Sequence, residues 1–126
     1  MYNLINGYTK KAMIAKILEG NKGWKSTRSS EKNGTCVYRA SDGNKCAVGC
    51  FIPDELYEPE MDEGQSEYDG IDAKTLLKTY PKLNNFMPLE VEGLLELQSV
   101  HDAFIDGIGV SLKQAIAHWI ENNVRD

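Results

Sequence analysis

Residues 35–57 of the chain read TCVYRASDGNKCAVGCFIPDELY, a stretch that predicts a β-hairpin. Residues 35–40 are rich in β-branched and aromatic side chains, which favour a strand. Asp42-Gly43 follows, and this pair between two apolar runs is typical of a hairpin turn. The return strand is expected over residues 45–52, and Pro53 ends it because proline cannot donate a hydrogen bond to a strand ladder.

If Asp42-Gly43 forms a two-residue turn, the turn fixes which residues of the two strands lie opposite each other. Arg39 is expected opposite Cys46, and Cys36 opposite Gly49. Because side chains alternate along a strand, Cys46 and Cys50 then share one face with Arg39, and Cys36 lies on the other face. The three cysteines are therefore not expected to meet at one point.

Helices are predicted on both sides of the hairpin from apolar stripes, capping residues and prolines. They cover, approximately, residues 9–19, 73–79, 88–105 and 111–124. The polar segments 21–34 and 58–72 are expected to be loops. Two strands cannot form a stable sheet alone, so three to four helices must pack against the hairpin. We expect a small α+β protein in which residues 1–126 form a single domain.

Composition and charge narrow the class of protein. Hydrophobic residues make up 41% of the chain, and no apolar run is long enough to cross a membrane. The beginning of the sequence lacks the pattern of a signal peptide, which favours a reducing cytosol. Net charge is −5, with nine Lys and Arg against three acids in residues 1–45, and nine acids and no base in residues 54–72. This acidic balance disfavours direct nucleic-acid binding.

The three cysteines allow two chemical interpretations, a metal site and a thiol enzyme. Their spacing fits no common zinc site, so we expect neither a metal nor a cofactor. Small thiols packed in a core are the simplest reading of such residues. The enzymatic alternative uses Cys46 or Cys50 as a nucleophile with His101 as its base.

Five residues are candidates for ligand binding. Arg39 and Lys45 lie at the rim of the predicted hairpin and would hold phosphates, while Tyr38 beside them, or alternatively Trp24, would stack on a base. His101 and Asp102 are adjacent on a leucine-rich helix, where the apolar stripe directs His101 to the core or to a cleft in it.

A second candidate surface is acidic. It is formed by carboxylates that follow the hairpin: Asp54, Glu55, Glu58, Asp62 and Glu63. Such a surface would bind a basic groove of a partner protein by imitating nucleic acid.

The central segment also carries a resemblance. Residues 36–57 follow the pattern C-x-Y-R-x3-G-x-K-C-A-V-G-C-x-I-P-D-E-x-Y, an acidic segment at 61–64 follows, and residues 97–102 read LQSVHD. This set resembles a group of small uncharacterised proteins of tailed bacteriophages and prophages. The resemblance covers residues 36–64 and 94–102, and the chain departs from it in a longer Lys- and Ser-rich segment before Cys36.

The resemblance implies a phage-encoded accessory protein that acts in the host bacterial cytoplasm. Proteins of this kind act by binding, so we expect an inhibitor of a host protein, such as a defence protein, or a protein that sequesters a nucleotide-like signal. The thiol enzyme described above is the alternative. A homo-oligomer is compatible with either function.

Overall fold

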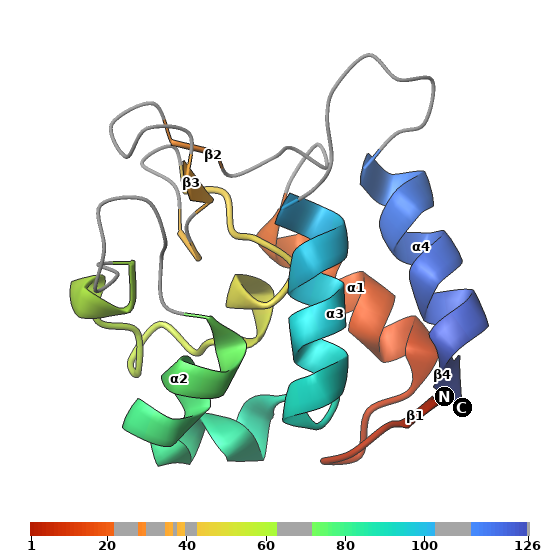
Figure 1. Ribbon diagram of the computed structural model, residues 1–126, viewed down its shortest axis with the longest axis horizontal. Helices are drawn as coiled ribbons and strands as arrows, with labels where there is room; N and C mark the ends of the chain where they lie inside the picture. The colour runs from red at the N-terminus through yellow and green to blue at the C-terminus, as the bar shows by residue number, and fades with distance from the viewer. Residues whose placement is uncertain are drawn as a thin grey trace.

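The computed structural model describes residues 1–21, 28–29, 35–36, 38–39, 43–62, 72–102 and 112–125. Its helices are α1 (Lys10–Gly20), α2 (Ala73–Thr79), α3 (Val91–Asp102) and α4 (Leu112–Asn123). Helix α3 packs against α2 on one side and against α4 on the other, and α1 also contacts α4 (Figure 1). With the short strands described next, this is the predicted α+β fold.

The strands are short and lie at two places (Figure 1). Strand β1 (Tyr2–Asn3) runs parallel to β4 (Val124–Arg125), which brings the two ends of the chain together. Strand β2 (Arg28–Ser29) runs antiparallel to β3 (Thr35–Cys36). Residues 28–29 are therefore a strand and not part of a loop over 21–34. The other residues of that predicted loop, after Asn21, lie outside the described part of the chain.

Capping residues fix the ends of two helices as the sequence predicts. The side chain of Thr9 accepts a hydrogen bond from the Ala12 amide at 3.1 Å and begins α1. The side chain of Asp72 accepts one from the Thr75 amide at 2.8 Å and begins α2. Helix α2 ends before Pro81, because a residue that precedes proline is disfavoured in helical conformation.

The core is built from the apolar stripes of the helices. Helix α4 and the strand after it bury an apolar stripe: Leu112, Ile116, Trp119, Ile120 and Val124. Helix α1 buries Met13 and Ile17, whereas Leu18 is 47% exposed. Full burial of one such aliphatic side chain stabilises a fold by about 1.5–3 kcal/mol.

The predicted return strand over residues 45–52 is wrong. Residues 49–51 form the 3-10 helix η2 (Gly49–Phe51), and the amide of Cys50 donates to the carbonyl of Cys46 at 3.0 Å. Every residue from Cys46 to Ile52 is buried, so the apolar residues show no alternation. A continuous apolar run does not distinguish a buried strand from a buried helical turn.

Among the described residues of the predicted hairpin over 35–40 and 45–52, one bridge joins the two sides. Arg39 pairs antiparallel with Lys45, and the amide of Cys46 donates to the Tyr38 carbonyl at 3.1 Å. The register therefore differs by one residue from the predicted pairing of Arg39 with Cys46. Gly49 is required where η2 meets this segment, because a Cβ there would lie 2.3 Å from the Tyr38 carbonyl oxygen. Asp42 of the predicted turn lies outside the described residues.

Helix α1 packs against η2 and holds Lys45 in place. The amide of Lys45 donates to the Gly20 carbonyl at 3.1 Å, and the side-chain amide of Asn21 donates to the Lys45 carbonyl at 2.9 Å. Gly20 allows a close approach, since a Cβ there would lie 2.6 Å from Cys50 Sγ.

The N-terminal segment joins α4 to the region after α2. Tyr2 stacks on Trp119 with ring centroids 6.0 Å apart. Asn6 has a positive φ of 56° and donates from Nδ2 to the carbonyls of Asn84 and Met87, each at 2.8 Å. Asn84 lies in the 3-10 helix η4 (Pro81–Phe86), so these bonds fasten the start of the chain to a segment some 80 residues away in sequence.

Candidate functional site

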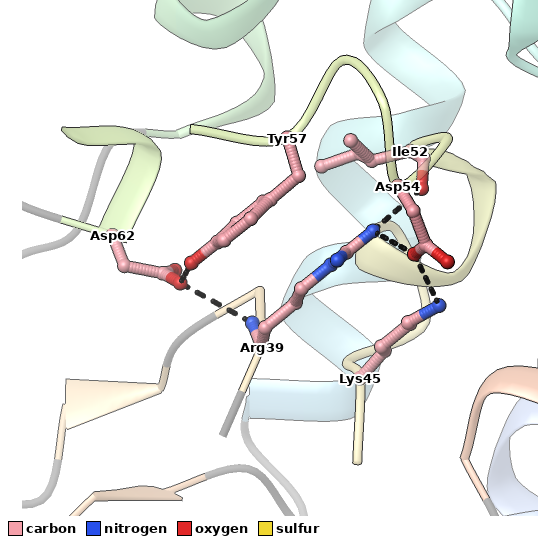
Figure 2. A network of polar contacts seen from close by, with 6 residues as sticks. All are labelled: Arg39, Lys45, Ile52, Asp54, Tyr57 and Asp62. Atoms are coloured by element: carbon pink, nitrogen blue, oxygen red, sulfur yellow. Dashed lines mark hydrogen bonds and ion pairs between the residues drawn. The ribbon is translucent and has the colours of Figure 1, made fainter. Parts of the chain in front are cut away.

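The candidate site is the Arg39 cluster, which we define as Arg39, Lys45, Asp54, Tyr57 and Asp62 (Figure 2). Its two cations come together because of the bridge between Arg39 and Lys45. Directly opposite residues of an antiparallel pair project from the same face, with Cβ atoms about 5 Å apart. The pairing of Arg39 with Lys45 therefore places two positive charges next to each other on this surface.

The guanidinium of Arg39 is held from several sides. It lies over the ring of Tyr57, with Cζ 4.2 Å from the ring centroid. Nη2 donates to the Ile52 carbonyl at 3.1 Å and pairs with Asp54 Oδ1 at 2.7 Å. A cation–π contact of this kind contributes about 0.5–1 kcal/mol where it is solvent-accessible, and it also restricts the side chain to one orientation.

Asp54 is the counter-ion of both cations. The same Oδ1 that pairs with Arg39 lies 3.5 Å from Lys45 Nζ (Figure 2). The positive charges of Lys45 first, and of Arg39 second, hold the pKa of Asp54 below its ordinary value. The Asp54 side chain is 78% exposed, whereas those of Arg39 and Lys45 are 19% and 24% exposed.

Asp62 is buried and links residues 38–39 to Tyr57 through hydrogen bonds. Its carboxylate accepts hydrogen bonds from the amide of Tyr38 at 2.6 Å, from the amide of Arg39 at 3.3 Å, and from the Tyr57 hydroxyl. Burial first, and this carboxylate second, raise the pKa of Tyr57. The prediction of Asp62 as an exposed acid is therefore wrong, because the side chain is 8% exposed and works as an internal acceptor.

Tyr38 is also buried, so the prediction that it stacks on a ligand base is wrong. Its hydroxyl accepts a hydrogen bond from Gln98 Nε2 at 3.2 Å, and Gln98 Oε1 in turn accepts one from the amide of Ala73. Tyr38 therefore connects the bridge segment to α2 and α3. Tyr57 is the aromatic side chain at the cations, and the sequence contained no spacing rule that would have identified it.

The remaining acidic candidates keep their predicted exposure where they are described. Asp54, Glu55 and Glu58 are exposed. Glu60 is exposed as well, although the sequence analysis did not single it out. Glu63 lies outside the described residues.

His101 is in the last turn of α3, and its side chain is fully buried. It is not part of the Arg39 cluster. Asp102 ends the same helix, and its side chain lies outside what the structure describes. The two residues therefore add no surface group to the candidate site among the side chains described.

The described cysteine thiols are inside the protein. Cys46 Sγ accepts a hydrogen bond from the Gly49 amide at 3.2 Å, and Cys50 Sγ donates to the Ile17 carbonyl at 3.4 Å. Burial raises the pKa of Cys50 to about 12, so its reactive thiolate is scarce near neutral pH. This environment disfavours Cys50 as a nucleophile. The described residues contain no cluster of His, Cys, Asp and Glu suited to a metal ion, and the Cys36 side chain lies outside them.

Comparison with protein-family models, with curated proteins and with solved structures gives no match to this chain. Among the helices in the described ranges, none is long and apolar enough to span a membrane. Function must therefore be argued from the geometry of the Arg39 cluster and of the acidic residues beside it.

Proposed function

We propose that this protein is a phage-encoded accessory factor that acts in the host bacterial cytoplasm by binding a basic site on a host protein and blocking it. The observation that supports this function is an exposed acidic surface held in one conformation. We define the acidic surface as Glu55, Glu58 and Glu60, which are all exposed. The phage origin rests on the resemblance of residues 36–64 and 94–102.

The segment that carries the acidic surface is fixed at both ends. At its start, Arg39 donates to the Ile52 carbonyl, and the amide of Tyr57 donates to the Pro53 carbonyl at 3.0 Å. At its end lies η3 (Pro59–Asp62), where Asp62 is bonded to the bridge segment and Met61 is fully buried. A surface that is ordered before binding loses little conformational entropy on association, which favours affinity.

The segment that carries the acidic surface contains no positively charged residue that could neutralise it. Asp54 pairs with Arg39 and Lys45, whereas residues 54–72 contain no Lys or Arg. The side chain of Glu58 accepts a hydrogen bond from the Tyr80 hydroxyl, an uncharged donor that adds no positive charge to the acidic surface. A basic groove would meet three carboxylates within six residues, which favours fast and oriented association.

The two other predicted functions have less support. Sequestration of a nucleotide was argued partly from a stacking role for Tyr38, which is buried, or for Trp24, which lies outside the described residues. Catalysis by a cysteine requires an accessible thiolate, and the Cys50 thiol is 4% exposed with a raised pKa. Binding to a protein uses the groups that are exposed.

The proposal is tested with two triple variants that remove the same charge. One is E55Q/E58Q/E60Q, and the matched control is E90Q/E92Q/E96Q, whose glutamates are also exposed and lie in or next to α3. Immobilised wild-type protein is used to capture partners from a host bacterial lysate, and the identified partner is then purified. Its dissociation constant is measured with each variant at several salt concentrations.

We expect binding to weaken with salt and the acidic-surface variant to lose about 3- to 150-fold in affinity, as three exposed ion pairs contribute about 0.6–3 kcal/mol together. The control variant should bind like wild type. In host cells, wild-type protein should increase plaque formation by a phage that the partner restricts, and the acidic-surface variant should not. Capture of no host protein, or equal loss in both variants, would contradict the proposal.

A further inference from the structure

The bridge between Arg39 and Lys45 creates an electrostatic problem that the fold has to solve. Two like charges directly opposite each other on paired segments destabilise the pairing. An anion between them removes the repulsion. In this structure the anion is the Asp54 carboxylate, whose Oδ1 lies 2.7 Å from Arg39 Nη2 and 3.5 Å from Lys45 Nζ.

The two cations are anchored much more firmly than the anion between them. Arg39 is held by the Tyr57 ring and the Ile52 carbonyl. The backbone of Lys45 is hydrogen-bonded to residues 20–21 at the end of α1. The Asp54 side chain, by contrast, is 78% exposed and lies in a surface turn. Replacement of Asp54 by another anion would leave these contacts of Arg39 and of the Lys45 backbone intact.

The charges in the cluster favour a ligand with more than one negative charge. Arg39 and Lys45 carry two positive charges, and Asp54 supplies one negative charge between them. Asp62 directs its carboxylate to the backbone amides and to Tyr57. Arg39 Nε is buried and has no hydrogen-bond partner among the described residues, so Asp54 does not use the whole fork of donors. A phosphate group carries a charge of about −1.5 to −2 near neutral pH and offers three acceptor oxygens.

We propose that Arg39 and Lys45 form a phosphate-binding site that the Asp54 carboxylate occupies when no ligand is bound. The ligand class is inorganic phosphate or a phosphate monoester such as a nucleoside monophosphate. This site goes beyond the proposed function and is independent of it, since it uses the two cations and not the acidic surface.

The site is tested by titrating the ¹⁵N-labelled full-length protein with inorganic phosphate near pH 7.5, with sodium chloride keeping a low and constant ionic strength. We expect saturable shifts of the amide signals of Lys45 and Asp54, with tighter binding of phosphate than of acetate. A parallel titration with AMP separates the two sources of the group: tighter binding than phosphate points to a nucleotide, and weaker binding points to the free ion. Absence of saturable binding of both phosphate and AMP overturns the proposal.

Variants test the role of Asp54 directly. Asp54→Asn should tighten phosphate binding about two- to fivefold, because the competing carboxylate is gone, whereas Glu92→Gln, which removes an exposed carboxylate of α3, should leave it unchanged. Lys45→Met should weaken binding by a similar factor, and Lys78→Met, which removes an exposed lysine of α2, should not. The amide spectrum reports the fold of each variant in the same experiment. Equal affinities for Asp54→Asn and Glu92→Gln, or for the two lysine variants, overturn the proposal. Because these variants leave Glu55, Glu58 and Glu60 in place, failure here is distinct from failure of host-protein binding.

Discussion

Asp62 is the residue on which the local structure around Arg39 depends most. Its carboxylate receives main-chain amides from residues 38–39 and the hydroxyl of Tyr57, so one side chain joins two segments. A buried amide that loses its acceptor costs about 1–3 kcal/mol, because the donor is left without water or a partner.

The first prediction concerns this acceptor. Asp62→Ala should lower the free energy of unfolding by about 2–4 kcal/mol, since the Tyr38 and Arg39 amides lose a charged acceptor. Urea denaturation followed by circular dichroism measures the change. Glu60→Ala, in the same 3-10 helix but exposed, should change the stability by less than about 0.5 kcal/mol. Equal effects of the two variants would show that Asp62 does not fasten the segments.

The second prediction concerns the Cys50 thiol. A rise in pKa from 9.0 to about 12 lowers the thiolate fraction at pH 8 about a thousandfold, and burial restricts access as well. Iodoacetamide should therefore label Cys50 at least about a thousandfold more slowly in the native protein than in urea, as measured by mass spectrometry of the Cys50 peptide. Labelling at the same rate in both conditions would restore Cys50 as a candidate nucleophile.

At the scale of single residues, the sequence identified the two cations but not what holds them. Arg39 and Lys45 follow from their position beside a turn signal. The backbone that places Tyr57 and Asp62 beside these cations runs through 3-10 turns. Such a backbone produces no regular spacing of apolar residues in the sequence. The burial of Asp62 could not be predicted from the sequence either, because an acidic residue within an acidic run normally belongs to a solvated face.

At the scale of elements, the helices were predictable and the segment 45–52 was not. Helix α2 has its predicted bounds because Asp72 and Pro81 give unambiguous start and stop signals. The apolar face of α4 could be predicted from the sequence, because its apolar residues recur on one side of the helix only. In residues 46–52 every side chain is buried, so neither helical nor strand periodicity is expressed.

The third prediction tests the contact between α1 and η2. Gly20→Ala should destabilise the protein by about 1–3 kcal/mol, because its Cβ would lie 2.6 Å from Cys50 Sγ. The double variant Gly20→Ala/Cys50→Ala removes that sulfur, so it should lose less stability than the two single variants added together. A double-mutant cycle from urea denaturation gives the coupling, expected at about 0.5–3 kcal/mol. A coupling of zero would mean that Gly20 is not required by this contact.

At the scale of the whole molecule, long-range hydrogen bonds join the first residues to the middle of the chain. Asn6 donates from Nδ2 to the carbonyls of Asn84 and Met87. An aspartate there has the same shape but presents an acceptor where two donors were needed. Substitution therefore tests the link without changing the packing volume.

The fourth prediction is that Asn6→Asp lowers the free energy of unfolding by about 1–3 kcal/mol at pH 7. The introduced carboxylate faces two carbonyl oxygens, so its folded pKa lies above its unfolded pKa of about 4. The deficit is therefore smallest below about pH 4, where the protonated carboxyl still donates one hydrogen bond, and it grows as the pH rises from there to the folded pKa. The control Asn3→Asp adds the same charge at an exposed position of β1 and should be nearly neutral. A deficit that does not depend on pH would contradict this account.

The pairing of β1 with β4 has a consequence for the time at which the protein can finish folding in the cell. Tyr2 is synthesised 122 residues before its partner Val124. At synthesis rates of about 5–20 residues per second, Tyr2 waits about 6–24 seconds for that partner. The Tyr2 ring has no Trp119 ring to pack against during this interval. Nascent chains of this protein are therefore expected to be substrates for ribosome-associated chaperones until α4 has been synthesised.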